Sequence, residues 1–360
     1  MYTLPTELVS EILRISGNPS AIRRVCKPFR EYHRSCVTEL DLDVGRGDEA
    51  AATEYVYRHA QLRKMSWTRT PTDGVQRTDF VEGVVSDPFD FDFSGLAKLV
   101  DLRICFPGPT RFTSSAWLAS LTSLTSLCLR WIDVDFRLDA PCLKSLTLTS
   151  CKCRFLPDIW KLTTLTFLDL EDTLGASMCE VLPGIGTLAS LAHLSLSERV
   201  RYSNDVLVPL TGLTGLTCLT LSKHGRRERA VRMPLVPNVA PLFGLPSLSH
   251  LKVEALFQLE SSCLEQSVAW IAALTTLTSL DMSGCMSVGQ SALAMLTLLP
   301  RLSKINVSRC RAVYGALDWT YLTAFPSLTE IVADPFWHLE PARAGVVAQL
   351  SAKVALTVAT

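Results

Sequence analysis

The chain has 360 residues, with 35 basic and 35 acidic side chains and therefore no formal net charge at pH 7. Proteins that bind nucleic acid through phosphate contacts usually carry a basic excess, so this balance argues against a nucleic-acid partner. The mean hydropathy of +0.24 is high, yet no apolar run approaches the ~20 residues of a membrane-spanning helix. No secretory signal is recognisable at the N-terminus, so the protein is expected in the cytoplasm or the nucleus, without a membrane partner.

Residues 1–36 form the first predicted unit, a cluster of three short helices. Leu8, Ile12 and Ile15 share one face of the first helix. A Gly-Asn-Pro sequence then ends that helix and starts a second one, and Pro28 marks the beginning of a third. A unit of this size cannot bury enough apolar surface by itself. Its apolar side chains must therefore pack on the rest of the chain, on a partner or on both.

Two short motifs stand out in this unit. Leu4-Pro5-x-Glu7-Leu8 is followed later by Val25-Cys26-Lys27-x-Phe29-Arg30. Together they resemble the F-box, although that family usually has tryptophan in place of Phe29 and a slightly longer linker between the halves. The resemblance implies docking onto the Skp-type adaptor of a cullin-RING ubiquitin ligase core. The implied interface consists of Leu4, Pro5, Leu8, Ile12, Leu13, Val25, Cys26 and Phe29.

From residue 37 to residue 360 the chain repeats the pattern Leu-x-x-Leu-x-x-Leu-x-Leu, seen most clearly in Leu121-Leu124-Leu127-Leu129. This is the leucine-rich-repeat signature. It predicts an α/β fold: a horseshoe-shaped solenoid with a parallel sheet on the concave side and mixed helical and irregular segments on the convex side. The third apolar position of each copy marks one expected strand, at Leu40, Met65, Leu102, Leu127, Leu146, Leu168, Leu194, Leu219, Leu251, Leu280, Ile305, Ile331 and Leu356.

The steps between these markers differ in length. Most are close to 25 residues and leave room for a convex helix, whereas the steps of 19 and 22 residues after Leu127 and Leu146 leave room only for a turn or a short 3₁₀ segment. Two steps are too long and predict insertions, an acidic one near 69–95 and a basic, proline-rich one near 223–241. These are either solvated insertions or arms that frame a ligand.

The 12 cysteines are interpreted as structural thiols. Cys151, Cys285 and Cys310 each lie three residues after the last expected strand leucine or its equivalent. In leucine-rich repeats this position holds a side chain that bonds to neighbouring backbone. Cys151 and Cys153 are the only close pair, without a second pair or a histidine at zinc-ligand spacing. Neither a metal nor a cofactor is expected.

Strand alternation places the residues that flank the inward leucines on the concave face. Small hydroxyl side chains predominate there, acids outnumber bases, and no basic stripe with interleaved aromatics is present. A polar or mildly basic protein segment is therefore the expected ligand. The candidate contact residues are Arg130, Phe167, Asp169, Glu171 and Lys252.

The sequence contains no phosphate-binding glycine loop and no nucleophile elbow, so it predicts a protein without catalytic activity. The leading hypothesis is a substrate-recognition adaptor of an SCF-type E3 ubiquitin ligase, in which the N-terminal unit docks on the Skp-type adaptor and the repeats bind the protein to be ubiquitinated. One alternative is a binding scaffold whose N-terminal helices only cap the solenoid. Another is an enzyme regulator resembling ribonuclease-inhibitor-like or Ran GTPase-activating leucine-rich proteins.

Overall fold

The structure is a computed structural model. It describes residues 37–44, 49–57, 59, 61–68, 87–89, 93, 95–112, 116–134, 138, 140–153, 156–171, 173, 178–197, 207–222, 240–254, 268–269, 271–285, 290–310, 320–334 and 355–358. The N-terminal unit, with all eight residues of the implied adaptor interface, lies outside these ranges. So does most of the basic insertion near 223–241.

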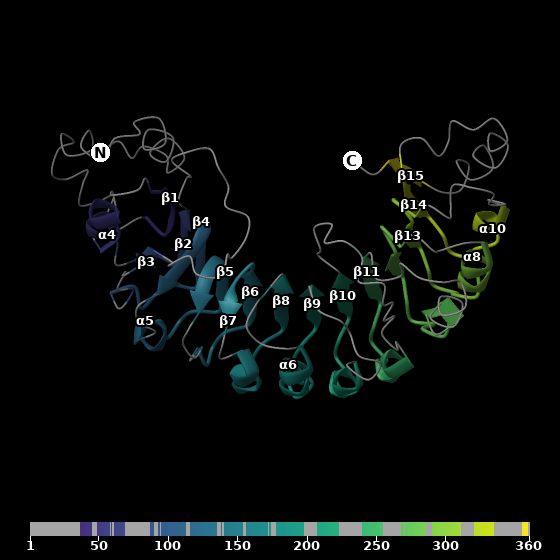
Figure 1. Ribbon diagram of the computed structural model, residues 1–360, viewed down its shortest axis with the longest axis horizontal. Helices are drawn as coiled ribbons and strands as arrows, with labels where there is room; N and C mark the ends of the chain where they lie inside the picture. The colour runs from purple at the N-terminus through teal and green to yellow at the C-terminus, as the bar shows by residue number, and fades with distance from the viewer. Residues whose placement is uncertain are drawn as a thin grey trace, which may run out of the picture.

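The described strands belong to one sheet that lines the inner side of an arc, while the helical segments lie along its outer side (Figure 1). All of the pairings are parallel. The strands on the main path are β1 (Glu39–Asp43), β2 (Lys64–Thr68), β4 (Asp101–Phe112), β5 (Ser126–Val134), β6 (Ser145–Thr149), β8 (Phe167–Glu171), β9 (His193–Ser197), β10 (Cys218–Ser222), β11 (His250–Glu254), β12 (Ser279–Asp281), β13 (Lys304–Asn306), β14 (Glu330–Ala333) and β15 (Ala355–Val358). This is a leucine-rich-repeat solenoid, as the sequence predicts.

The strand register confirms the predicted repeat positions. Leu40 pairs with Met65, which pairs with Leu102, and the row continues through all of the marker residues to Leu356. The inward positions are buried, as Leu168 and Leu170 illustrate with 0% exposure. Each buried leucine contributes about 1.5–3 kcal/mol relative to an exposed one. One continuous row of apolar side chains therefore holds successive repeats together.

The outer side combines two kinds of helical segment. The α-helices are α4 (Glu49–Tyr57), α5 (Ala116–Ser120), α6 (Met178–Ile185), α8 (Gln290–Leu296) and α10 (Thr320–Thr323), and the 3₁₀ segments are η1 (Leu156–Lys161), η2 (Val208–Gly212) and η3 (Ala240–Gly244). The 3₁₀ segment expected in the 22-residue step after Leu146 is confirmed as η1. A 25-residue step does not always give an α-helix, since η2 lies in such a step. In the described part of the chain, no helix has the length and apolar character needed to cross a membrane.

A ladder of hydroxyl groups joins the repeats next to the strand beginnings. The residue just before a strand donates its side-chain hydroxyl to the backbone carbonyl of the equivalent residue in the preceding repeat, at 3.0 to 3.3 Å. The donors are Thr125, Thr166, Thr217, Ser249, Thr278, Ser303 and Thr329. The same carbonyl also accepts two backbone N–H groups, as Ser249 does from Thr278 and Ser279. These bonds satisfy polar groups at the edge of the core.

A second ladder, made of thiols, is confirmed beyond the strand ends. Cys151 donates to the Leu129 carbonyl at 3.2 Å, and Cys285 donates to Val253 at 2.9 Å. Cys310 makes the equivalent bond to Met282 at 3.1 Å. All three cysteines are 0% exposed, so these thiols are part of the core, as the sequence indicates.

Of the acidic insertion predicted near 69–95, the structure describes only residues 87–89, 93 and 95. Residues Asp87–Phe89 form β3, which pairs with the second half of β4, and Lys152–Cys153 form β7, which pairs with β5. Phe93 is fully buried, and its ring lies 4.8 Å from that of Trp117. Strands β3 and β7 thus add to the sheet outside the regular repeat, and the Phe93–Trp117 contact adds to the core beside them.

Candidate functional site

The register arranges the concave side chains in three rows that run across the strands. The central part of the first row, from β8 to β11, contains Phe167, His193, Cys218 and His250; that of the second row contains Asp169, Ser195, Thr220 and Lys252; and that of the third row contains Glu171, Ser197, Ser222 and Glu254. The intervening leucines point into the core. Side chains far apart in sequence thus become neighbours on one surface.

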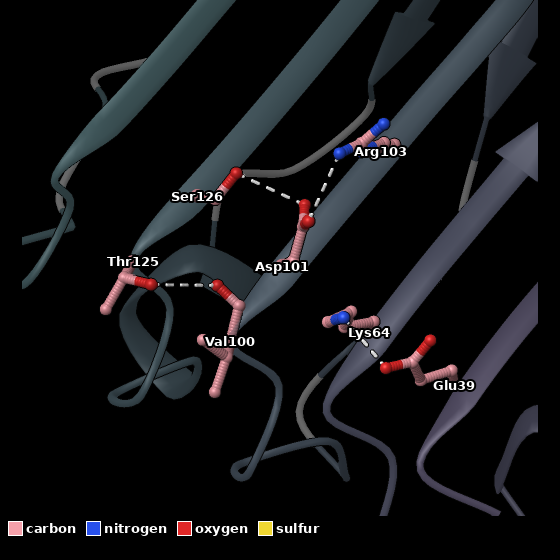
Figure 2. A network of polar contacts seen from close by, with 7 residues as sticks. All are labelled: Glu39, Lys64, Val100, Asp101, Arg103, Thr125 and Ser126. Atoms are coloured by element: carbon pink, nitrogen blue, oxygen red, sulfur yellow. Dashed lines mark hydrogen bonds and ion pairs between the residues drawn. The ribbon is translucent and has the colours of Figure 1, made fainter. Parts of the chain in front are cut away.

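The N-terminal end of this surface carries charges that pair with each other (Figure 2). Lys64 contacts Glu39 at 2.8 Å, and Asp101 accepts both Arg103 at 3.5 Å and the Ser126 hydroxyl at 3.2 Å. Toward the C-terminal end, Lys304 pairs with Glu330 at 2.8 Å. Opposite charges balance at both ends of the surface.

The centre of the surface carries an excess of acid. We define the acidic patch as Asp169, Glu171, Glu254 and Asp281 together with Lys252. It comprises four carboxylates and one ammonium group on strands β8, β11 and β12. Burial lowers the pKa of Lys252, but its bond to Glu254 at 2.8 Å and the attraction of Glu254, Asp281 and Glu171 outweigh burial, so the pKa is raised. The lysine is held by acids from both sides and stays charged.

Asp169 is the most constrained carboxylate of the acidic patch. Burial raises its pKa, a hydrogen bond from Ser195 opposes that effect, and repulsion from Glu171 adds to it. Its Oδ1 atom is buried without a hydrogen-bond partner. A buried carboxylate oxygen without a donor is costly. Asp169 is therefore a destabilising group in the folded protein.

An exposed ring pair lies beside the acidic patch. Phe167 and His193 occupy the first row of β8 and β9, with ring centroids 5.9 Å apart and planes tilted by 32°. Phe167 remains 36% exposed. Aromatic side chains with this exposure are frequent anchors in protein interfaces. The ring pair adds an apolar contact surface next to the carboxylates.

The structure brings four of the five candidate contact residues into this region. Phe167, Asp169 and Glu171 share strand β8, and Lys252 lies near enough to Glu171 for attraction between their charges. Arg130 is separate: it is exposed on β5 and lies opposite Cys105 of β4. The ligand contacts themselves remain predictions.

Three members of the site were not selected from the sequence. Strand alternation places His193, Glu254 and Asp281 on the concave face, but alternation alone does not show that they are neighbours of the candidate contact residues. The available signal was their equivalent position in successive repeats, which places His193 opposite Phe167 and Asp281 opposite Lys252. Counting positions from each marker leucine would have found them.

Within the described ranges, no group of three or more histidine, cysteine or acidic side chains is arranged to hold a metal ion. The two concave histidines are set apart by strand β10, since His193 lies on β9 and His250 on β11. His250 contacts the hydroxyl of its neighbour Ser249 at 2.8 Å. The concave surface thus offers charged and aromatic contacts to a ligand.

No protein-family model and no curated protein matches this sequence. Among solved structures, the internalin InlF from Listeria monocytogenes strain 4b F2365 is similar, with a TM-score of 0.40 and 15% identity, over 77% of this chain and 82% of that one. The functional domain of InlJ from Listeria monocytogenes, described as including a cysteine ladder, gives a TM-score of 0.42 and 16% identity over 78% of this chain. The alignment spans only 56% of the InlJ domain.

Proposed function

We propose that this chain is a non-catalytic protein-binding scaffold whose concave surface holds a basic segment of a partner protein. The observation that carries the proposal is the acidic patch, in which Glu171, Glu254 and Asp281 attract Lys252. Asp169 adds a fourth carboxylate on β8, beside the exposed aromatic pair. A lysine or arginine of the partner would neutralise the excess charge. Its N–H groups would donate to carboxylates of the acidic patch.

The charge distribution favours the centre of the concave surface over its ends. At the ends, Lys64 and Lys304 are neutralised by Glu39 and Glu330 on neighbouring strands. Exposed ion pairs of this type contribute little to stability or binding. At the centre, repulsion between Asp169 and Glu171 is relieved when a cation arrives. Electrostatic complementarity of this kind selects a basic partner and speeds association.

The test is fluorescence anisotropy with a labelled peptide of alternating arginine and serine, and with a glutamate–serine peptide of equal length. The arginine peptide should bind, and increasing salt should weaken the binding because partly exposed charges are screened. Asp169→Asn and Glu171→Gln should each weaken binding by about 3- to 20-fold, which corresponds to ~0.7–1.8 kcal/mol.

The matched control is Glu39→Gln. It removes one carboxylate from the same concave face, but at the paired N-terminal end. This variant should bind the arginine peptide like the unmodified protein. Equal losses in Glu39→Gln and Asp169→Asn would show a non-specific charge effect and contradict the proposal, as would equal affinity for both peptides.

We propose a second, more specific role on the sequence motif alone. The Leu4-Pro5-x-Glu7-Leu8 and Val25-Cys26-Lys27-x-Phe29 elements support docking on a Skp-type adaptor, so that the scaffold would present its partner to a cullin-RING ubiquitin ligase. Such a receptor would act by proximity, because it raises the effective concentration of target lysines near the conjugating enzyme. This role would place the protein in the cytoplasm or the nucleus.

Co-expression with a Skp-type adaptor tests this role separately. A stoichiometric complex is expected, and the pair Leu8→Asp and Phe29→Ala should abolish it while Asp169→Asn leaves it intact. If the N-terminal helices only cap the solenoid, deletion of residues 1–36 lowers the unfolding midpoint and no adaptor co-purifies. That result would remove the ligase role and leave the scaffold role standing.

A further inference from the structure

Two cysteines and two arginines form a square on the concave surface of β4 and β5. The register places Arg103 opposite Cys128 and Cys105 opposite Arg130. Each thiol thus has a guanidinium group directly across the strand pair, and the two thiols occupy one diagonal. Cys105 and Cys128 are partly accessible, and both arginines are exposed. The square is therefore open to small molecules from the concave side.

The two thiols influence each other's ionisation. A hydrogen bond between them favours a negative charge on one sulfur while the other keeps its proton. The bond from Cys128 lowers the pKa of Cys105 to about 7, against the opposing effect of burial, and Arg130 and Arg103 lower it further. The pKa of Cys128 is raised by the same hydrogen bond and by burial. Cys105 lies opposite Arg130, whereas Cys128 lies opposite Arg103, which is paired with Asp101. The geometry therefore favours the thiolate on Cys105 and the proton on Cys128.

Among the residues that the structure describes, the strands beside Cys105 place no acidic side chain opposite it in the register. On β2 its partner in the register is Thr68, and the charged Lys64 of that strand is held by Glu39. On β4 itself, Asp101 is engaged by Arg103 and Ser126. On β6, Thr149 lies opposite Arg130, and Cys151 is buried in the thiol ladder. The charged groups that act on Cys105 are Arg130 and Arg103, and both lower its pKa.

The diagonal arrangement permits proton sharing but disfavours a disulfide between the two thiols. Residues two positions out of register on neighbouring strands have Cα atoms roughly 8 Å apart, from the strand spacing and the rise per residue. A disulfide requires a Cα separation below about 7 Å. Bond formation between Cys105 and Cys128 would therefore require the backbone to move. A bond from Cys105 to an external sulfur has no such constraint.

We propose that Cys105 is a modification site that undergoes thiol–disulfide exchange with small disulfides bearing carboxylates, such as oxidised glutathione. The Cys105 thiolate attacks one sulfur of the disulfide, the bond between the two sulfurs breaks, and a mixed disulfide forms on Cys105. The departing thiolate takes a proton from solvent. Arg103 and Arg130 hold the carboxylates of the incoming molecule. Cys128 is a positioning residue that keeps its proton throughout.

The first test compares Cys105 with Cys142, an exposed cysteine of the same protein. The folded protein is treated with oxidised glutathione at pH 7, quenched in acid, digested and analysed by mass spectrometry. Cys105 should form the mixed disulfide about three- to fivefold faster than Cys142, because its larger thiolate fraction is partly offset by lower intrinsic nucleophilicity. Equal or slower reaction at Cys105 would overturn the inference.

The second test uses the pH profile of iodoacetamide alkylation. Half-maximal alkylation of Cys105 is expected near pH 7, and that of an ordinary thiol near pH ~8.5. Cys128→Ala and Arg130→Gln should each move the Cys105 profile to higher pH, whereas Cys128→Ser, which retains a donor, should restore it. An unchanged profile in Cys128→Ala contradicts the assigned role of Cys128.

Loss of two hydrogens from the pair, without any adduct, would instead reveal a disulfide between Cys105 and Cys128 and would overturn the proposal. The comparison of Cys105 with Cys142 needs no variant, so it stands even if a substitution prevents folding. The inference is also independent of partner binding. The square lies on β4 and β5, whereas the acidic patch lies on β8, β11 and β12.

Discussion

Gly186 and Pro209 approach so closely on the convex side that residue 186 has no room for a side chain. A Cβ atom on Gly186 would lie 2.2 Å from the backbone carbonyl oxygen of Pro209 in the next repeat. The carbonyl of Gly186 in turn lies 2.9 Å from the Cβ position of Gly212. Successive convex segments therefore stack backbone against backbone at this point of the solenoid.

The Gly186→Ala variant should be destabilised because the added methyl group forces the two repeats apart. Overpacking of this kind costs about 1–3 kcal/mol, and the urea midpoint should fall accordingly. Gly215→Ala is the control, since its Cβ would meet its nearest neighbour, the Ala189 carbonyl oxygen, at an ordinary 3.7 Å. Similar midpoints for the two variants would contradict the close stacking.

The apolar row should dominate the stability of the solenoid. Leu194 is 1% exposed in the centre of β9, and Leu194→Ala should lower the free energy of unfolding by about 2–5 kcal/mol. Thr220→Ala, on the concave face of the next strand, should change it by less than about 0.5 kcal/mol. Chemical denaturation of both variants gives the comparison.

The hydroxyl ladder should contribute measurably at each repeat. Thr278→Val keeps the shape of the side chain but removes the donor to the Ser249 carbonyl at 3.1 Å. The loss of one such bond should cost about 0.5–1.5 kcal/mol. Thr275→Val, at an exposed position of the same repeat, is the control. No difference between these two variants in urea would show that water replaces the hydroxyl donor.

The thiol ladder should be chemically inert in the folded protein. Burial raises the pKa of Cys151 to about 12, and it also raises the pKa of Cys310. Both should therefore resist iodoacetamide at pH 8 and react only after unfolding in guanidinium, since the thiolate is the reactive form. The exposed Cys142 should react in both states. Rapid labelling of Cys151 in the folded protein would contradict its place in the core.

Asp169 should reduce stability at neutral pH. Burial raises its pKa above the unfolded value of about 3.9, so between these two pKa values the folded chain binds more protons than the unfolded chain. The free energy of unfolding therefore falls as pH rises through this window. Asp169→Asn should raise the melting temperature at pH 7. The difference in melting temperature between this variant and the unmodified protein should shrink as pH falls toward 4. An advantage that grows at low pH would contradict this assignment.

The stability gained by Asp169→Asn should accompany weaker binding of the arginine peptide. Functional sites often retain a group that destabilises the free protein, because the ligand later satisfies that group. Glu171→Gln tests the same idea from the neighbouring position, since Glu171 helps to raise the pKa of Asp169. Its effect on stability should have the same sign as that of Asp169→Asn.

Much of the architecture follows from the sequence alone. A period of two within each strand and a recurring leucine along the chain suffice to place every strand of the main path, from β1 to β15, in the correct register. The thiol ladder was also predictable, because Cys151, Cys285 and Cys310 hold the same position in their repeats. These features are local or strictly periodic, so they can be read without knowing what lies across the sheet.

Only the tertiary structure decided how closely concave side chains on different strands approach each other. The stacking of the repeats sets the ring centroids of Phe167 and His193 5.9 Å apart. It also brings the charge of Glu171 on β8 within reach of Lys252, three strands away on β11. The same stacking places Cys105 against Cys128 and pairs β3 with β4. The physical reason is that alternation fixes the face on which a side chain lies, whereas the alignment and curvature of successive strands fix its neighbours. The fold could therefore be predicted from the sequence, whereas the chemistry of its concave surface depends on how the repeats stack.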